Sequence, residues 1–285
     1  MGWKGILHKF LFYWFVSLTL MATTGLGPAL AKGQKVGEEQ NNNGGFMEVS
    51  FGLAALNSRF VDAPYHLGSL LDLRLNYQWN GFFIEDKGLN GVGLPGIGYN
   101  FYNDQAWSLD IYLNEIYGEI ATGDGDTIRD EQSGLTGIHP RKSDDRIGLR
   151  ATYSIDESSV FRMLAAPISA RDGNGLHLAA WYGKTWQYYN INFRSVLGAQ
   201  YDSSKTLDYY FGVAPSEASD KFPVYQAGSG VTLSAELGLS YPLAKDWVLE
   251  SSLKFIRLPD SIYHSPLIEP RVEAIAQVSL VYVLF

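Results

Sequence analysis

Cysteine is absent from the 285-residue chain. Its absence excludes disulfide bonds, thiolate metal sites and lipid attachment to an N-terminal cysteine. Exported soluble proteins often contain disulfides, whereas a β-barrel closed by its own backbone hydrogen bonds does not need them. The lack of cysteine therefore fits a barrel, although composition alone also allows a β-sandwich.

Long apolar runs are absent after residue 31, so no transmembrane helix is predicted there. The one apolar run, Phe10 to Leu20, follows a basic start with Lys4 and Lys9 and precedes Ala29-Leu30-Ala31. This order is typical of a secretory signal peptide. A membrane anchor is the alternative, but Thr, Gly and Pro residues interrupt the run short of the roughly 20 apolar residues that a spanning helix needs. We expect residues 1–31 to be a signal peptide that is cleaved after Ala31.

Basic residues are few, with 22 Lys and Arg against 30 Asp and Glu, and the formal net charge is −8. Cleavage after Ala31 removes Lys4 and Lys9 and no acidic residue, which leaves 20 basic against 30 acidic residues and a net charge of −10. A protein this acidic is a poor nucleic-acid binder, so we expect no nucleic-acid partner.

Aromatic residues make up 14% of the chain, and it contains 30 glycines, a composition that suits an exported membrane barrel. Residues 32–44 hold no aromatic and one aliphatic residue, and we expect them to form a flexible arm in the periplasm. The barrel itself is expected to occupy residues 45–285.

Apolar and polar residues alternate along runs of about ten residues from Gly45 onward, a length that fits a tilted membrane-spanning strand. The pattern predicts about twelve strands, at residues 45–56, 69–79, 82–87, 91–102, 105–114, 145–155, 159–169, 175–185, 189–201, 230–241, 246–258 and 271–284. If the short segment 82–87 is not a strand of its own, the count falls to ten. Aromatic residues at strand ends, such as Trp79 and Trp247, favour a membrane barrel over a soluble sandwich.

The connections between these strands alternate between short and long. Outer-membrane barrels have short periplasmic turns, longer outer loops and, in bacteria, an even number of strands. The sequence therefore predicts an all-β fold, an antiparallel transmembrane β-barrel with both chain ends in the periplasm. Asn90-Gly91 and Asp172-Gly173 are expected to be two tight outer turns.

The alternation also assigns the two faces of the wall. Leu233, Leu237 and Leu253 are expected to face lipid, and the charged residues of the other face to line the lumen. The predicted lumen charges are Glu48, Asp72, Arg74, Asp110, Arg146, Arg150, Glu236, Glu250 and Lys254. Because both signs are mixed, we interpret them as pairs that fill the lumen, and a selective pore is the alternative.

Four short motifs point to a family: Asp208 to Val213 (DYYFGV), Pro223 to Gly228 (PVYQAG), Leu239 to Leu243 (LSYPL) and Pro64 to Ser69 (PYHLGS). With them the chain resembles the MipA/OmpV family of outer-membrane proteins, MltA-interacting protein and its relatives. The matching positions are Tyr65, Gly68, Tyr209, Tyr210, Phe211, Gly212, Tyr225, Gly228, Tyr241, Trp247, Ser265, Pro266 and Phe285. The family usually ends with an aromatic residue, any residue, then Phe; here Phe285 is kept and Tyr282 is displaced by one position.

The resemblance implies a barrel in the outer membrane of a Gram-negative bacterium, with outer-membrane lipid around it. It also implies that the C-terminal strand ending in Phe285 is the signal for the barrel-assembly machinery. For function it implies a structural or scaffolding protein that links a murein hydrolase and a murein synthase. Other members are associated with antibiotic response or adhesion.

Residues suited to catalysis form no trusted pattern. The histidines left after cleavage are His66 (with Ser69), His139, His177 and His264 (with Ser265). A lipid hydrolase would use such Ser and His residues, but we expect the His264-Ser265 pair to belong to a turn. Asp124-Gly125-Asp126 is a weak suggestion of a Ca²⁺ site. We therefore expect no enzyme, no catalytic residues, no cofactor and no metal.

The long connection 202–229 contains both aromatic motifs, Tyr209 to Gly212 and Tyr225 to Gly228. Either they form a surface for a ligand or partner, or they fold back over the lumen as a plug, because exposed aromatic residues are unfavourable. Among functions we expect a scaffold first. A small-solute channel or an envelope-stress or antibiotic-response barrel is the alternative, and a lipid hydrolase comes last.

Overall fold

The computed structural model describes residues 43–63, 66–85, 95–120, 134–169 and 175–285. The expected signal peptide, residues 32–42 of the expected arm and the predicted outer turns Asn90-Gly91 and Asp172-Gly173 lie outside these ranges.

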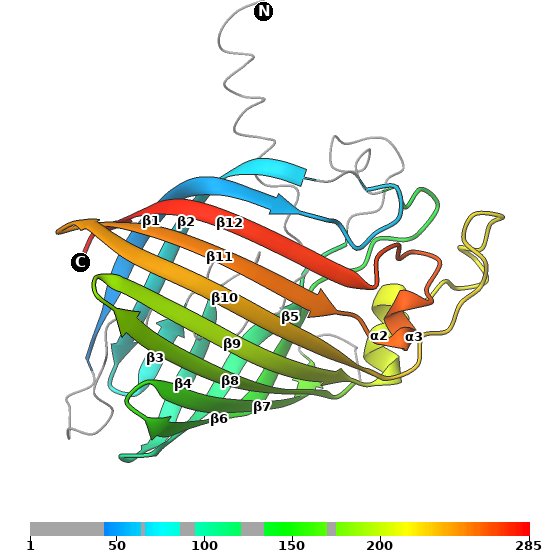
Figure 1. The fold of residues 1–285 in the computed structure, drawn as a ribbon. Helices are drawn as coiled ribbons and strands as arrows, with labels where there is room; N and C mark the ends of the chain where they lie inside the picture. Colours follow the sequence, from blue (N-terminus) through cyan, green and yellow to red (C-terminus); the bar gives the residue numbers. More distant parts are fainter. Residues whose placement is uncertain (1–42, 64–65, 86–94, 121–133, 170–174) are drawn as a thin grey trace, which may run out of the picture.

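Twelve strands form one closed antiparallel barrel, in which each strand pairs with its neighbours in sequence and β12 closes on β1 (Figure 1). The pairing of β1 with β12 runs from Glu48 opposite Val283 to Leu56 opposite Ile275. The strands are β1 (Gly44–Leu56), β2 (His66–Trp79), β3 (Phe82–Glu85), β4 (Gly96–Asn103), β5 (Trp107–Tyr117), β6 (Asp144–Asp156), β7 (Ser159–Ser169), β8 (His177–Tyr188), β9 (Ile191–Asp202), β10 (Gly230–Ala244), β11 (Trp247–Arg257) and β12 (Val272–Val283).

The predicted barrel is confirmed, with twelve strands and not ten. The doubtful segment forms β3, a strand of its own that pairs with β2 on one side and β4 on the other. β1 begins at Gly44, one residue before the predicted start of the barrel. Alternation identified the strands well because the wall has two faces of different polarity along its whole length.

Several predicted strand bounds differ from the structure by a few residues, and at the β8–β9 hairpin the connection itself was misplaced. The prediction placed the connection at residues 186–188, but β8 continues to Tyr188 and β9 begins at Ile191, so Tyr189 and Asn190 form the turn. The segment contains no glycine or proline, and aromatic and polar residues alternate across it. Nothing local therefore marked the turn.

The two ends of the barrel differ, as the loop lengths predicted. Short hairpin turns and the ends of the described chain lie together at one end, here called the turn end (Figure 1). At Asn80-Gly81 both residues have positive φ, 48° and 84°, which is the backbone of a tight two-residue hairpin. The opposite end, the loop end, carries the helices α2 (Ser204–Phe211) and α3 (Asp260–Tyr263).

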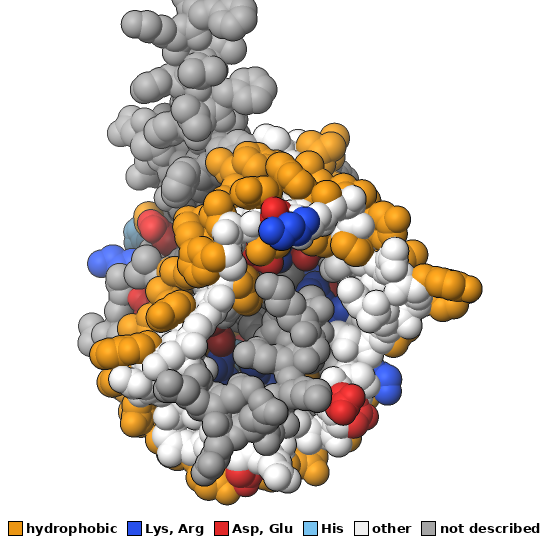
Figure 2. Space-filling model, turned by 90° about the vertical axis from the view of Figure 1, so that its left-hand side faces the viewer, with side chains coloured by type: hydrophobic (Ala, Val, Ile, Leu, Met, Phe, Trp, Pro, Cys, Tyr) orange, Lys and Arg blue, Asp and Glu red, His pale blue; other side chains and the backbone are white. Residues whose placement is uncertain are grey.

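The outer face is apolar and the inner face polar. Leu233, Leu237 and Leu253 are 45%, 59% and 40% exposed, whereas Glu236, one residue from Leu237, is 7% exposed. The face assignment is thus confirmed at these positions. Figure 2, seen from the turn end, shows apolar side chains around the rim and charged side chains within the opening. In the described part of the chain, no helix has the length and apolarity to cross a membrane.

Aromatic side chains stand in cross-strand pairs near the turn end. The pairs are Phe82–Tyr99, Trp107–Tyr153, Trp186–Phe193 and Trp247–Tyr282, with ring centroids 4.8, 4.8, 5.8 and 4.9 Å apart. We call these four pairs the turn-end girdle. Such belts mark the headgroup level of a membrane barrel, so the girdle fixes where the hydrocarbon ends on this side.

Leu237→Arg should lower the free energy of unfolding by about 2–4 kcal/mol, because it places a charge on the lipid face near mid-membrane. The neighbouring Glu236→Gln should cost less, because glutamine still accepts the Arg194 Nη2 hydrogen bond and the Arg194 side chain is 27% exposed, so water in the lumen can solvate its charge. Denaturant unfolding of the barrel in lipid vesicles measures both. Equal losses at the two positions would show that the register is wrong.

Candidate functional site

The lumen is lined by charged side chains, and the nine predicted lumen charges all lie on its wall. Seven of the nine are buried, and Asp72 and Glu250 are partly exposed to the lumen. A charge away from water is stable only with a partner. What these residues contact therefore decides whether the lumen is a passage or a packed interior.

Arg150 is the centre of one charged group, formed by β3, β5 and β6. Its Nε lies 2.8 Å from Asp110 Oδ2, and its Nη1 is paired with Glu85. The guanidinium also lies over the rings of Tyr112 and Phe83, 4.2 and 4.8 Å from their centroids. Arg150 of β6 thus contacts two carboxylates and two aromatic rings from β3 and β5.

Arg74 is the centre of a second group, across β1, β2 and β11. Its Nη2 lies 3.1 Å from Glu48 Oε2, and its Nη1 lies 3.1 Å from Glu250 Oε2. Asp72 stands two residues along the same face of β2. This arginine bridges carboxylates on both sides of the β1–β12 seam, where the barrel closes. Glu48 lies on β1, and Glu250 lies on β11, the strand next to β12.

The third group runs along β9, β10 and β11. Glu236 lies between Arg194 Nη2, at 2.7 Å from Oε1, and Lys254 Nζ, at 4.0 Å from Oε2. Nearer the loop end, Arg59 pairs with Glu273 through two of its guanidinium nitrogens, with Nε 2.6 Å from Oε1 and Nη2 2.9 Å from Oε2. Positive and negative groups alternate along the wall. The paired-lumen interpretation is therefore confirmed for these residues, which show no sorting of one sign as a selective filter would.

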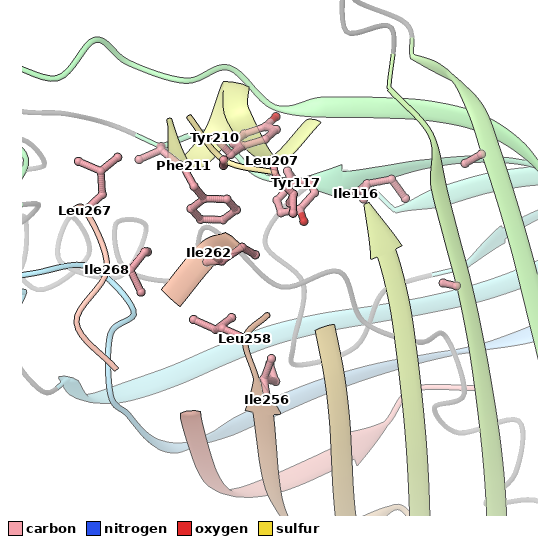
Figure 3. Close-up of a cluster of buried hydrophobic side chains, with 14 of the residues drawn as sticks. Ile116, Tyr117, Leu207, Tyr210, Phe211, Ile256, Leu258, Ile262, Leu267 and Ile268 are labelled. Carbon is pink, nitrogen blue, oxygen red and sulfur yellow. The ribbon is translucent and has the colours of Figure 1, made fainter. Parts of the chain in front are cut away.

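The loop end of the lumen contains an apolar plug, here defined as α2, α3 and the described loop residues that pack with them. Its buried side chains meet those at the loop ends of β5 and β11 (Figure 3). The residues labelled there are Ile116, Tyr117, Leu207, Tyr210, Phe211, Ile256, Leu258, Ile262, Leu267 and Ile268. Tyr210 and Phe211 are at most 1% exposed. Of the two readings of the aromatic loop, the plug is confirmed.

The family-motif residues of the two long loops, residues 209–228 and 265–266, lie in or beside this plug. Ser265 Oγ donates to the carbonyl of Phe211 at 2.6 Å and accepts from the N–H of Leu267, which ties the last long loop to α2. Tyr225 OH donates to the Ser261 carbonyl, and residues 213 and 225 form a β-bridge. The expected turn role of Ser265 is thus confirmed.

Gly212 is required by close approach and not by its backbone angle. A Cβ at this position would lie 2.3 Å from the carbonyl oxygen of Asp208, closer than packing allows. The same backbone N–H of Gly212 donates to Asp208 O and ends α2. The motif glycine therefore lets the chain turn tightly away from the helix into the β-bridge.

Other motif positions lie away from the plug. Tyr241 and Trp247 stand near the turn end, where Trp247 belongs to the girdle. Gly68 lies on β2 with open space where a Cβ would be. At the chain end, the carbonyl of Phe285 accepts from Met47 N–H, so the terminal residue still pairs with β1. Tyr65 lies outside the described residues.

Two buried arginines hold the plug in place, Arg141 in the β5–β6 connection and Arg146 on β6. Arg141 makes two hydrogen bonds to Glu217, at 2.7 and 2.9 Å, and a longer one to the Gly212 carbonyl. Arg146, 1% exposed, pairs with Asp144 on its own strand and donates to Thr206 of α2 at 2.9 Å. Separation of these segments would leave Arg141 and Glu217 without their charge partners, whereas Arg146 would keep Asp144 and lose its contact with Thr206.

The contacts of Glu217 lower the pKa of its carboxyl group. Burial alone would raise its pKa, but hydrogen bonds from Arg141 and from the backbone N–H groups of Ala214 and His139, with the charge of Arg141, lower the pKa to about 2. Burial raises the pKa of Tyr210 above its ordinary value, so its phenol stays protonated and donates to the Lys142 carbonyl at 2.6 Å.

His139, His177 and His264 occupy three separate places in the described structure. His177 is buried and its Nδ1 lies 2.8 Å from Asp202, which also accepts from Tyr117 OH. Its Nε2 has no hydrogen-bond partner among the described residues, so no hydroxyl there is within reach as a nucleophile. His139 is largely exposed, and His264 lies just after α3.

No metal site is found within the described ranges, where no three His, Asp or Glu residues converge. The suggested Asp124-Gly125-Asp126 site lies outside those ranges. Sequence reasoning did not predict the contacts made by Arg59, Arg141, Asp202, Glu217 and Glu273 at the loop end. Arg141 and Glu217 are 76 residues apart in the chain, and no local pattern connects them.

Glu217→Gln should release the plug at neutral pH, because it leaves Arg141 buried without its counter-charge, a loss of roughly 3–5 kcal/mol when one partner of a buried pair is removed. Trypsin should then cut faster at Arg141, Lys142 and Lys221, and the exposed Glu269→Gln is the control. In the wild type the pair's contribution is complete above pH 4.5 and is lost as the pH falls toward 2, because the pKa in the fold lies below its ordinary value. Pepsin cleavage of the wild-type plug should therefore increase only as the pH falls from 4.5 toward 2. Equal cleavage of the Glu217→Gln and wild-type barrels at neutral pH would show that the pair does not hold the plug.

Comparison with known proteins identifies a family and relatives that this chain resembles. The sequence model of the family described as MltA-interacting protein MipA matches residues 51–284. The chain is 26% identical to outer membrane protein Omp26La of Vibrio anguillarum, over 68% of this chain and 71% of that protein. It is 24% identical to the MltA-interacting protein of Escherichia coli, over 73% and 79%.

Outer-membrane barrels of known structure are less similar to this chain in sequence. The KdgM porin is 10% identical with a TM-score of 0.40, and the NanC porin is 7% identical with a TM-score of 0.44; each alignment covers 82% of this chain and 98% of the porin. The family match spans nearly the whole described barrel, and the relatives are outer-membrane proteins. This chain is therefore an outer-membrane β-barrel that belongs to the MipA/OmpV family of MltA-interacting proteins.

Proposed function

We propose that this barrel is a non-enzymatic scaffold that holds a murein hydrolase, and through it murein-synthesising machinery, at the inner surface of the outer membrane. The observation that carries the proposal is the filled loop end of the lumen. A barrel whose interior is packed with paired charges and an apolar plug offers its surfaces, and not its lumen, for function.

The plug argues against a permanently open small-solute channel. Its side chains Tyr210, Phe211 and Ile262 are at most 1% exposed. Opening a path through them would expose this apolar surface and break the Arg141–Glu217 pair. The free energy of burying the apolar surface and that of the ion pair both oppose opening.

The murein partner is supported by a relative's name. The Escherichia coli protein is named for interacting with MltA, and we carry a partner of that class, a murein hydrolase, to this chain. The turn end, which faces the periplasm in such barrels, is where this partner would bind. The barrel-assembly machinery would recognise β12 earlier, during insertion, through the strand that ends at Phe285.

The turn end has little area to offer apart from the arm. A stable interface usually buries about 800 Å² per partner, and two-residue turns such as Asn80-Gly81 do not supply it. Residues 32–42 are then the main candidate for contact area. They carry Glu38, Glu39 and several asparagines but almost no apolar residue, so a transient contact is expected.

Purified barrel in lipid nanodiscs should bind the purified murein hydrolase of its own organism, and deletion of residues 35–42 should weaken that binding. The deletion leaves Asn43 in place, whose Oδ1 accepts from the Asn80 N–H at 2.7 Å, so the start of β1 stays anchored. Replacing the segment with a Gly-Ser linker of equal length is the matched control for tether length. If the wild-type barrel does not bind the hydrolase at all, the scaffold proposal is wrong.

A further inference from the structure

The β8–β9 hairpin continues past its own girdle pair at the turn end. Its girdle pair is Trp186 with Phe193, and two more cross-strand pairs follow, Gln187 with Asn192 and Tyr188 with Ile191. At about 3.4 Å per residue, the turn residue Tyr189 stands on the order of 10 Å further along the strand than Trp186. The hairpin tip, defined here as residues 187–192, therefore lies on the periplasmic side of the headgroup level.

Tyr189 occupies a position that a tyrosine rarely takes. Its φ is +51°, close to the +48° of Asn80 in the β2–β3 turn, where asparagine and glycine are the favoured residues. Its side chain is 81% exposed, more than any other large apolar side chain of the described chain. Tyr188, in edge contact with it at 4.6 Å, is 62% exposed. Backbone strain and exposure together are unfavourable in the free barrel, which points to a contact that uses the aromatic rings.

The tip also has an open backbone edge. The pairing of β7 with β8 ends at Ser159 opposite Lys184, and the last bond runs from Thr185 N–H to the Ser158 carbonyl. Within the described ranges no strand pairs with residues 186–188 on that side. Because alternate residues of a strand point their backbone groups the same way, the N–H and C=O of Gln187 face this edge, as those of Thr185 do.

The chemistry of the tip selects a class of partner. From Thr185 to Phe193 there is no charged residue, and five of the nine are aromatic or isoleucine. An open strand edge beside exposed aromatic side chains is the arrangement that accepts an extended peptide as an added strand. Aromatic residues are also the usual energetic anchors of protein interfaces. The apolar contact that the arm lacks is available here.

We propose that the β8–β9 tip docks an extended, uncharged segment of the periplasmic partner protein by strand addition along Gln187, with Tyr188 and Tyr189 as the anchor. The inference rests on the proposed scaffold function and names its contact surface. The tip is small compared with a standard interface, so it supplies the anchor of the contact and not its whole area.

The test measures the Kd of the murein hydrolase for the full barrel in nanodiscs. Tyr189→Asn should weaken binding by about tenfold or more, although asparagine suits the positive φ and should not impair folding. Gln187→Pro removes the N–H at the open edge and should weaken binding more than Gln187→Ala, which removes only the side chain. Glu157→Ala, in the neighbouring β6–β7 turn, should bind like the wild type. Heat-modifiable gel mobility reports that each variant is a folded barrel.

The outcomes separate the two proposals. If the wild type binds and Tyr189→Asn binds equally well, the tip is not the contact, and the scaffold proposal stands without it. If Tyr189→Asn weakens binding but Gln187→Pro and Gln187→Ala are alike, strand addition is wrong. If instead Tyr189 is needed for retention on purified murein sacculi but not for hydrolase binding, the partner is a glycan and the proposal is overturned. No binding by the wild type removes the scaffold function itself.

Discussion

Backbone hydrogen bonding is the constraint on which the rest of this structure depends. In the hydrocarbon of a membrane each unpaired N–H or C=O costs several kcal/mol, so a sheet can cross only if it closes on itself. The pairing of β1 with β12 meets that condition. Closure then fixes polarity: alternation puts one set of side chains toward lipid, where it must be apolar, and the other toward the lumen. The charges of the lumen are a consequence of the closed wall.

A lumen that receives charges must neutralise them, and this barrel does so with arginines that each hold more than one partner. Arg150 and Arg74 each bind two carboxylates, one on the adjacent strand and one on a strand three positions away in the sheet. At the loop end, arginines also bind the plug. Arg141 binds Glu217 and Arg146 binds Thr206, and both partners lie far away in the sequence. The long loops fold inward because their aromatic residues find apolar neighbours at the ends of β5 and β11 and would otherwise face water.

The strands could be predicted from the sequence because each carries its own signal, a period of two between a lipid face and a lumen face. The plug could be suspected from its aromatic motifs, but its fastening could not. Arg141 and Glu217 meet only through the closed fold, and Ser265 reaches Phe211 across 54 residues. The hairpin tip was misplaced for a related reason. Tyr189 takes a backbone conformation that its residue type argues against, so a turn stands where the local preference is for strand.

The central claim is that the lumen is a packed interior and not a pore. Single-channel recording in planar bilayers tests it most directly, with the barrel inserted at neutral pH. The account predicts that the wild type shows no steady, reproducible openings, and that openings appear when the plug is released by Glu217→Gln. Steady openings of the wild-type barrel with the same size as those of the variant would contradict it, because the plug would then not close the lumen.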